Sequence, residues 1–150
     1  MDMQGEGARH LLAALAECSD RLRTFAYKLY LRHHGSSWTQ NLVVSGTPFT
    51  IGRQGSNEVF ERCFVPSVRL HLSDSTAIAF SIHLCWNADI WMVEADVEVQ
   101  DDNEDDPRYL WHSQAKRTQS LDEAIAYLVD ATRQVVHYGE ARDFEQAMHE

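Results

Sequence analysis

The chain has 150 residues, enough for one domain with a hydrophobic core, and a formal net charge of −10. Residues 73–106 hold ten acidic residues and no Lys or Arg, so this segment accounts for the whole excess and argues against nucleic-acid binding. No membrane span, secretory signal or disulfide framework is expected from the hydropathy, the N-terminal residues or the three cysteines. We therefore expect a soluble cytoplasmic protein with a single domain over residues 1–150.

The first expected element is a long helix over residues 7–34. Its apolar residues recur at alternating steps of four and three, which is typical of one buried helical face. This stripe consists of Leu11, Leu15, Cys18, Leu22, Phe25 and Leu29. We expect it to pack on the protein's own sheet, and a dimer face is the alternative.

Strands follow the helix. They are expected at residues 38–44, 49–51, 59–65 and 68–72. Residues 45–48, Ser-Gly-Thr-Pro, are expected to connect the first two strands as a hairpin, and residues 52–57 form a loop. Pro66 is expected to end the third strand, because proline lacks the N–H that a sheet requires.

Two central strands, residues 78–86 and 91–99, have the strongest alternation of apolar and polar residues, and a short turn at residues 87–89 makes them antiparallel neighbours. Side chains alternate strictly between the faces of a strand. Glu94, Asp96 and Glu98 must therefore share one face, which we expect to be hydrated and at an exposed edge.

The C-terminal part begins with an acidic loop, residues 101–106, followed by a strand over residues 108–114. Ser120 and Glu123 form a capping box that opens a helix, and Gly139 is expected to cap its end. Residues 141–150 form a short helical tail with little to bury. The predicted fold is α+β, with an antiparallel sheet of four to six strands and both helices on one side.

Catalytic motifs are scarce. The chain contains no phosphate-binding glycine loop, nucleophile elbow or metalloprotease motif. A zinc site from His71, His83 and Cys85 is conceivable if neighbouring strands bring them together. A calcium loop starting at Asp101 would need Gly and Glu where Asp106 and His112 stand. We expect no catalytic residue, no metal and no cofactor.

The candidate site is a collective acidic surface with two aromatic anchors, suited to a protein partner with a basic surface. Its residues are Glu94, Asp96, Glu98, Asp101, Asp102, Glu104, Asp105, Asp106, Tyr109 and Trp111. The alternative interpretation is a charged face that serves only solubility.

This layout resembles immunity proteins of bacterial polymorphic-toxin systems, of the Rhs-type and contact-dependent kinds. The resemblance covers roughly residues 75–138 and lies in the runs AIAFSIHLCW-NAD-IWMVEADVEV, the acidic loop, YLWHSQ and SLDEAIAYLVDATRQVV. It implies a cytoplasmic antidote that binds a cognate toxin, some of which are ADP-ribosyltransferases, and occludes the active site. The acidic residues would then face the toxin's basic groove.

Two other functions stay open at the level of sequence. A small acidic secretion or folding chaperone would bind an extended client segment and use the stripe of the first helix as a dimer face. An enzyme would use a pocket around His71, His83 and Cys85. The sequence leaves open the oligomeric state, the strand order and the identity of the partner.

Overall fold

The computed structural model describes residues 5–33, 35–45, 49–51, 58–87, 89–142 and 144. Within them a helix is followed by strands and a second helix, which confirms the α+β fold. The elements are α1 (Glu6–Arg32), β1 (Ser37–Ser45), β2 (Phe49–Ile51), β3 (Glu58–Phe60), β4 (Arg62–His71), β5 (Thr76–Asn87), β6 (Ile90–Asp101), β7 (Arg108–His112), β8 (Lys116–Thr118) and α2 (Leu121–Ala141).

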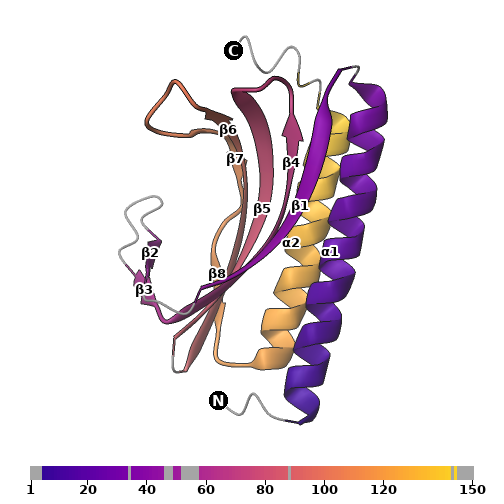
Figure 1. The fold of residues 1–150 in the computed structure, drawn as a ribbon. Helices are drawn as coiled ribbons and strands as arrows, with labels where there is room; N and C mark the ends of the chain where they lie inside the picture. Colours follow the sequence, from indigo (N-terminus) through magenta and orange to yellow (C-terminus); the bar gives the residue numbers. More distant parts are fainter. Residues whose placement is uncertain are drawn as a thin grey trace.

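The main sheet has six antiparallel strands in the order β1-β4-β5-β6-β7, and β8 pairs with the other end of β6. β5 and β6 pair over their full length, which confirms the predicted meander. Figure 1 shows α1 and α2 side by side on one face of the curved sheet, as expected, while the small β2–β3 pair lies beyond the opposite face. We call the face without helices the open face.

The core lies between the two helices and the sheet. The α1 stripe is buried there, with Leu22 fully covered and Phe25 packed edge-on against Phe80 of β5 at 5.0 Å between ring centroids. Each such side chain contributes about 2 kcal/mol through its burial. The stripe therefore packs on the protein's own sheet, as expected, and the alternative dimer face is wrong.

Gly139 does not cap the second helix, because α2 continues to Ala141. A side chain at this position would collide with the ring of Phe25, so the glycine allows α1 and α2 to approach closely. The expectation of a tail with little to bury is also wrong at Phe144, which is fully buried and packs edge-on against Phe80. The rest of the tail, apart from Ala141 and Arg142, lies outside the described residues.

Two predictions about the first strands are wrong. β1 pairs with β4, whereas β2 pairs with β3, so the first two strands are not a hairpin; residues 46–48 and the loop at residues 52–57 lie outside the described residues. Pro66 does not end a strand, since β4 runs through it and pairs it with Leu42 of β1. Its missing N–H is consistent with the interruption in the β4–β5 pairing at this point.

The start of α2 confirms the capping box, because the Ser120 hydroxyl accepts a hydrogen bond from the Glu123 backbone N–H at 3.3 Å. β7 also lies where a strand was expected. β8 was not expected, because its three residues, Lys-Arg-Thr, have no apolar alternation. It matters for the site because it covers the part of β6 that β7 leaves unpaired.

Candidate functional site

The three carboxylates of β6 lie on the open face, as the alternation predicted. The residues that alternate with them, Val93, Ala95 and Val97, belong to the core under the helices. The expectation that this row is hydrated is wrong for Glu94, which is 6% exposed, and for Asp96, which is 4% exposed, whereas Glu98 is half-buried. The expectation that the row lies at an edge is also wrong. β6 is an internal strand, with β5 on one side and both β7 and β8 on the other.

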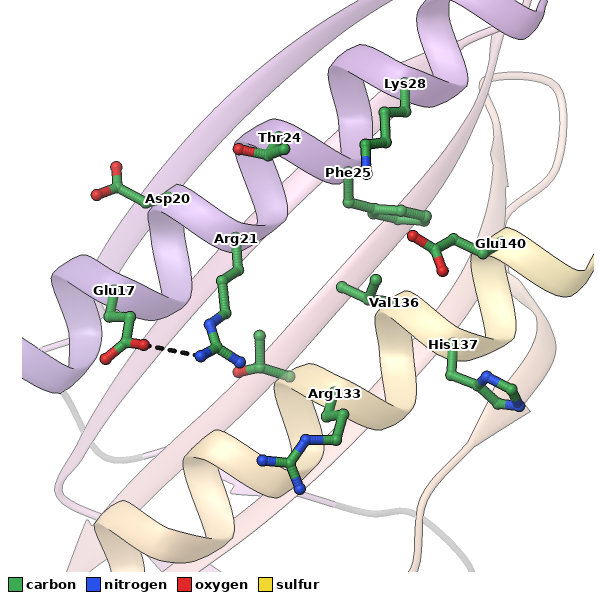
Figure 2. A pocket seen from close by; sticks show the side chains of 11 residues that line it. Glu17, Asp20, Arg21, Thr24, Phe25, Lys28, Arg133, Val136, His137 and Glu140 are labelled. Atoms are coloured by element: carbon green, nitrogen blue, oxygen red, sulfur yellow. Dashed lines mark hydrogen bonds and ion pairs between the residues drawn. The ribbon is translucent and has the colours of Figure 1, made fainter.

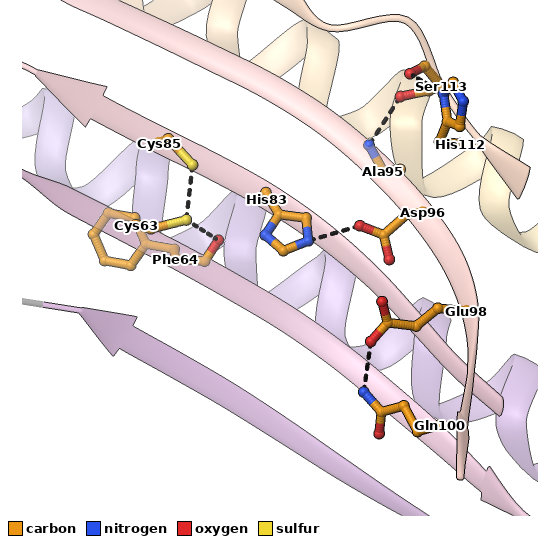
Figure 3. A network of polar contacts seen from close by, with 10 residues as sticks. All are labelled: Cys63, Phe64, His83, Cys85, Ala95, Asp96, Glu98, Gln100, His112 and Ser113. Carbon is orange, nitrogen blue, oxygen red and sulfur yellow. Dashed lines mark hydrogen bonds and ion pairs between the residues drawn. The ribbon is translucent and has the colours of Figure 1, made fainter. Parts of the chain in front are cut away.

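Asp96 is part of a polar network on the open face (Figure 3). Its Oδ2 lies 2.9 Å from Nε2 of His83 on β5, and the two residues are diagonal neighbours across the strands. Burial alone would lower the pKa of His83, but hydrogen bonds to Asp96 and Cys63 and the negative charge of both raise it to about 10. His83 is therefore a cation at neutral pH and balances Asp96.

Two thiols lie next to this ion pair. Cys63 of β4 and Cys85 of β5 are directly opposite in the register, and their sulfur atoms are 2.8 Å apart. The hydrogen bond with Cys85, together with His83, outweighs burial and the negative charge of Glu94 and lowers the pKa of Cys63 to about 6. The same hydrogen bond and burial raise the pKa of Cys85, so Cys63 is the more acidic thiol of the pair.

The acidic loop contrasts with this network because its side chains from Asp102 to Asp106 are exposed. The turn is nevertheless ordered: the Asp101 side chain accepts a hydrogen bond from the Asn103 backbone N–H at 2.9 Å. The Asp102 N–H donates to the carbonyl of Ser75 at 2.9 Å, which ties the loop to the preceding turn. No Lys or Arg of the described chain forms an ion pair with these carboxylates.

The two expected aromatic anchors lie on opposite faces of the sheet. Between Val97 and Glu98 the β6–β7 register shifts, so that Tyr109 pairs with Glu98 and Trp111 pairs with Val97. Tyr109 is 48% exposed, as an anchor requires. Trp111 instead stacks on Tyr138 of α2 at 5.5 Å, so its predicted place beside the carboxylates is wrong.

The alternative zinc site is not formed. His71 pairs with Ala77, six residues along β5 from His83, a separation of about 20 Å. Within the residues that the structure describes, no group of three or more His, Cys, Asp or Glu side chains is arranged to hold a metal ion. Sequence reasoning weighed Cys85 with His83 but missed Cys63 and Asp96 as their neighbours. Only the register of β4, β5 and β6 brings these four together.

A hollow lies between the outer surfaces of α1 and α2, away from the open face (Figure 2). It has a volume of about 650 Å³, and its lining includes three acidic and three basic side chains. These are Glu17, Asp20, Arg21, Lys28, Arg133 and Glu140. Because the charges balance and Glu17 and Arg21 already pair at 2.8 Å, the groove favours no sign of ligand charge.

The chain matches no protein-family model, no curated protein and no solved structure. Among the described residues no helix has the length and apolar character that crossing a membrane requires.

Proposed function

We propose that this protein binds a partner protein with a basic surface through the acidic loop, and that the partner is a bacterial toxin neutralised in the cytoplasm. The observation that carries this proposal is an ordered turn with four exposed carboxylates, at Asp102, Glu104, Asp105 and Asp106, that form no ion pair with a described Lys or Arg. Binding rather than catalysis is the proposed activity.

The physical reason is electrostatic. Like charges gathered on one turn repel each other, and this repulsion is relieved when cations of a partner approach. Because the hydrogen bonds of Asp101 and Ser75 already order the turn, a partner would lose little conformational entropy in the loop on binding. Complementary charge would also speed the encounter and disfavour acidic partners.

The proposed contact is narrower than the surface expected from the sequence. Glu94 and Asp96 are too buried to meet a partner directly, and Trp111 is engaged with α2. The acidic loop remains, together with Tyr109 as its aromatic anchor and the half-buried Glu98 beside it. The chaperone alternative loses the dimer face assigned to it, because the α1 stripe is buried in the core.

The test begins with the partner. Protein that co-purifies from host cells is identified by mass spectrometry, and we expect it to stop growth when it is produced alone. Co-production of this chain should restore growth. In calorimetric titrations, Asp105→Lys with Asp106→Lys should weaken binding by about 3 kcal/mol, because two attractions become repulsions.

The matched control is Glu61→Lys with Asp89→Lys, which changes the net charge equally at exposed positions outside the loop. This control should bind almost as tightly as the wild type. Equal losses in both double variants would mean that only overall charge matters and would contradict the loop as the contact. A partner that does not affect growth would contradict the antidote function.

A further inference from the structure

The cluster of Cys63, Cys85, His83 and Asp96 has no role in the proposed binding of a toxin. Cys63 and Cys85 face each other across β4 and β5 with their sulfur atoms 2.8 Å apart. A disulfide bond is about 2.05 Å long, so these atoms need to approach by less than about 1 Å to bond. The two strands already hold the residues in register, and little backbone movement is required.

The neighbours of the two thiols make them chemically different from each other. His83 lies between Asp96 and Cys63 in Figure 3, with Nε2 2.9 Å from the Asp96 carboxylate. The protonated ring therefore sits beside the Cys63 sulfur and favours its thiolate. When Cys63 is ionised, the S–H of Cys85 is the group that can donate across the 2.8 Å between the two sulfur atoms. Such an arrangement separates an attacking sulfur from a resolving one.

The burial of the pair restricts what can reach it. Cys63 is 1% exposed and Cys85 is 0% exposed, and both belong to a small buried cluster with Phe60 and Met92. A bulky disulfide such as oxidised glutathione would require the strands to open, whereas hydrogen peroxide is close to water in size. We propose that Cys63 and Cys85 form a redox site that hydrogen peroxide converts into an intramolecular disulfide.

The reaction proceeds in two balanced steps. The Cys63 thiolate attacks one oxygen of the peroxide, the O–O bond breaks, and the departing hydroxide takes the proton of His83 to become water. Cys63 is then a sulfenic acid. Cys85 passes its proton to His83 and attacks the Cys63 sulfur, the S–O bond breaks, and hydroxide takes that proton to leave as a second water. The two sulfurs lose two electrons in total, and the peroxide gains them.

The third cysteine provides an internal control in the same molecule. Cys18 of α1 is also buried, at 3% exposure, but no second thiol lies beside it in the described chain. Burial, opposed only in part by the hydrogen bond from Thr132 and the charge of Arg21, raises the pKa of Cys18 to about 11. It should therefore react far more slowly than Cys63.

The experiment treats the reduced full-length chain with hydrogen peroxide and follows the intact mass and the unreduced peptides. We expect a loss of two hydrogens and a peptide pair linked through Cys63 and Cys85, while Cys18 stays reduced. Cys85→Ser should stop at a sulfenic acid on Cys63, which is seen as a gain of one oxygen in the intact mass. Cys18→Ser, the matched control, should form the disulfide at the wild-type rate.

His83 is tested as a positioning residue through the pH profile. In wild-type protein the oxidation rate should reach half its maximum near pH 6, and His83→Gln should move this midpoint upward by at least one pH unit. Oxidation of Cys18 as fast as of Cys63, or peroxide treatment that leaves both Cys63 and Cys85 as thiols, would overturn the proposal. Because both readings come from the wild type, misfolding of a variant would not obscure the result.

Discussion

Two groups of carboxylates, only a few residues apart in the chain, have opposite environments. Asp96 is 4% exposed, and its Oδ2 lies 2.9 Å from Nε2 of His83. Asp105 and Asp106 are exposed on a turn and form no ion pair with a Lys or Arg of the described residues. All belong to the same segment without Lys or Arg. The environment of each carboxylate follows from its strand neighbours, and the charge of the segment as a whole does not determine it.

The difference separates two kinds of charge in this protein. A buried carboxylate must have a partner because its lost hydration is expensive, and here the partner is a histidine on the adjacent strand. An exposed carboxylate keeps its hydration and can be replaced at little cost to the fold. We therefore expect Asp96 to stabilise the fold and tune the thiols, and the acidic loop to serve recognition.

The largest effect should come from Asp96→Ala. It leaves the His83 cation on the open face without its carboxylate, and we expect a loss of about 3 kcal/mol in the free energy of unfolding. Urea denaturation measures the change. Asp105→Ala is the comparison in the loop and should cost less than about 0.5 kcal/mol.

If Asp96→Ala lowered the free energy of unfolding by less than about 1 kcal/mol, the contrast between the two groups of carboxylates would be wrong. The buried carboxylate would then matter no more to stability than the exposed one. The double variant His83→Ala with Asp96→Ala separates the ion pair from its packing. It should be more stable than Asp96→Ala alone, since no His83 cation that has lost its carboxylate remains.

The pH dependence of stability should give a smaller effect. Asp96 helps to raise the pKa of His83 from 6.5 to about 10, and the cluster lowers the pKa of Cys63 from 9.0 to about 6. Between pH 6.5 and 9 the folded state holds a proton on His83 and the unfolded state holds one on Cys63. The numbers of bound protons match, so stability should be flat in this window and fall as the pH rises above 9.

Cys63→Ser removes the compensating thiol. Below pH 9, His83 is then the cluster residue whose bound proton differs between the two states, because its contact with Asp96 keeps its folded pKa raised. The free energy of unfolding should fall as the pH rises above 6.5, by up to about 1.4 kcal/mol per pH unit. Urea titrations at several pH values measure the slope. Cys18→Ser should retain the flat profile, and a flat profile in Cys63→Ser would contradict the coupling.

The elements and their facing were predictable from periodicity, and the site was predictable only in part. Alternation correctly put Glu94 and Asp96 on the face opposite Val93 and Val97. Their burial could not be foreseen, because it depends on β7 and β8 both pairing with β6, and β8 is three polar residues with no apolar pattern. Local patterns do not contain such long-range pairing.

The same limit explains the dithiol and the misplaced aromatic anchor. Cys63 meets Cys85 because β4 pairs with β5, and β4 runs through Pro66, where a sequence rule ends a strand. Strict alternation would put Trp111 on the same face as Tyr109. A register shift between β6 and β7 instead turns Trp111 toward α2. Periodicity gives the face of a residue within its own strand, and the register between strands decides which residues meet.

The smallest expected effect concerns the acidic loop itself. If its carboxylates repel one another, Asp105→Asn with Asp106→Asn should raise the free energy of unfolding by up to about 0.5 kcal/mol at low salt. The gain should disappear near 1 M salt, where the screening length is about 3 Å. Denaturation at the two salt concentrations measures it, with Glu61→Gln and Asp89→Asn as the control pair outside the loop. A loss of stability at low salt would mean that the loop carboxylates have favourable contacts in the fold, and the loop would then resemble the buried group around Asp96.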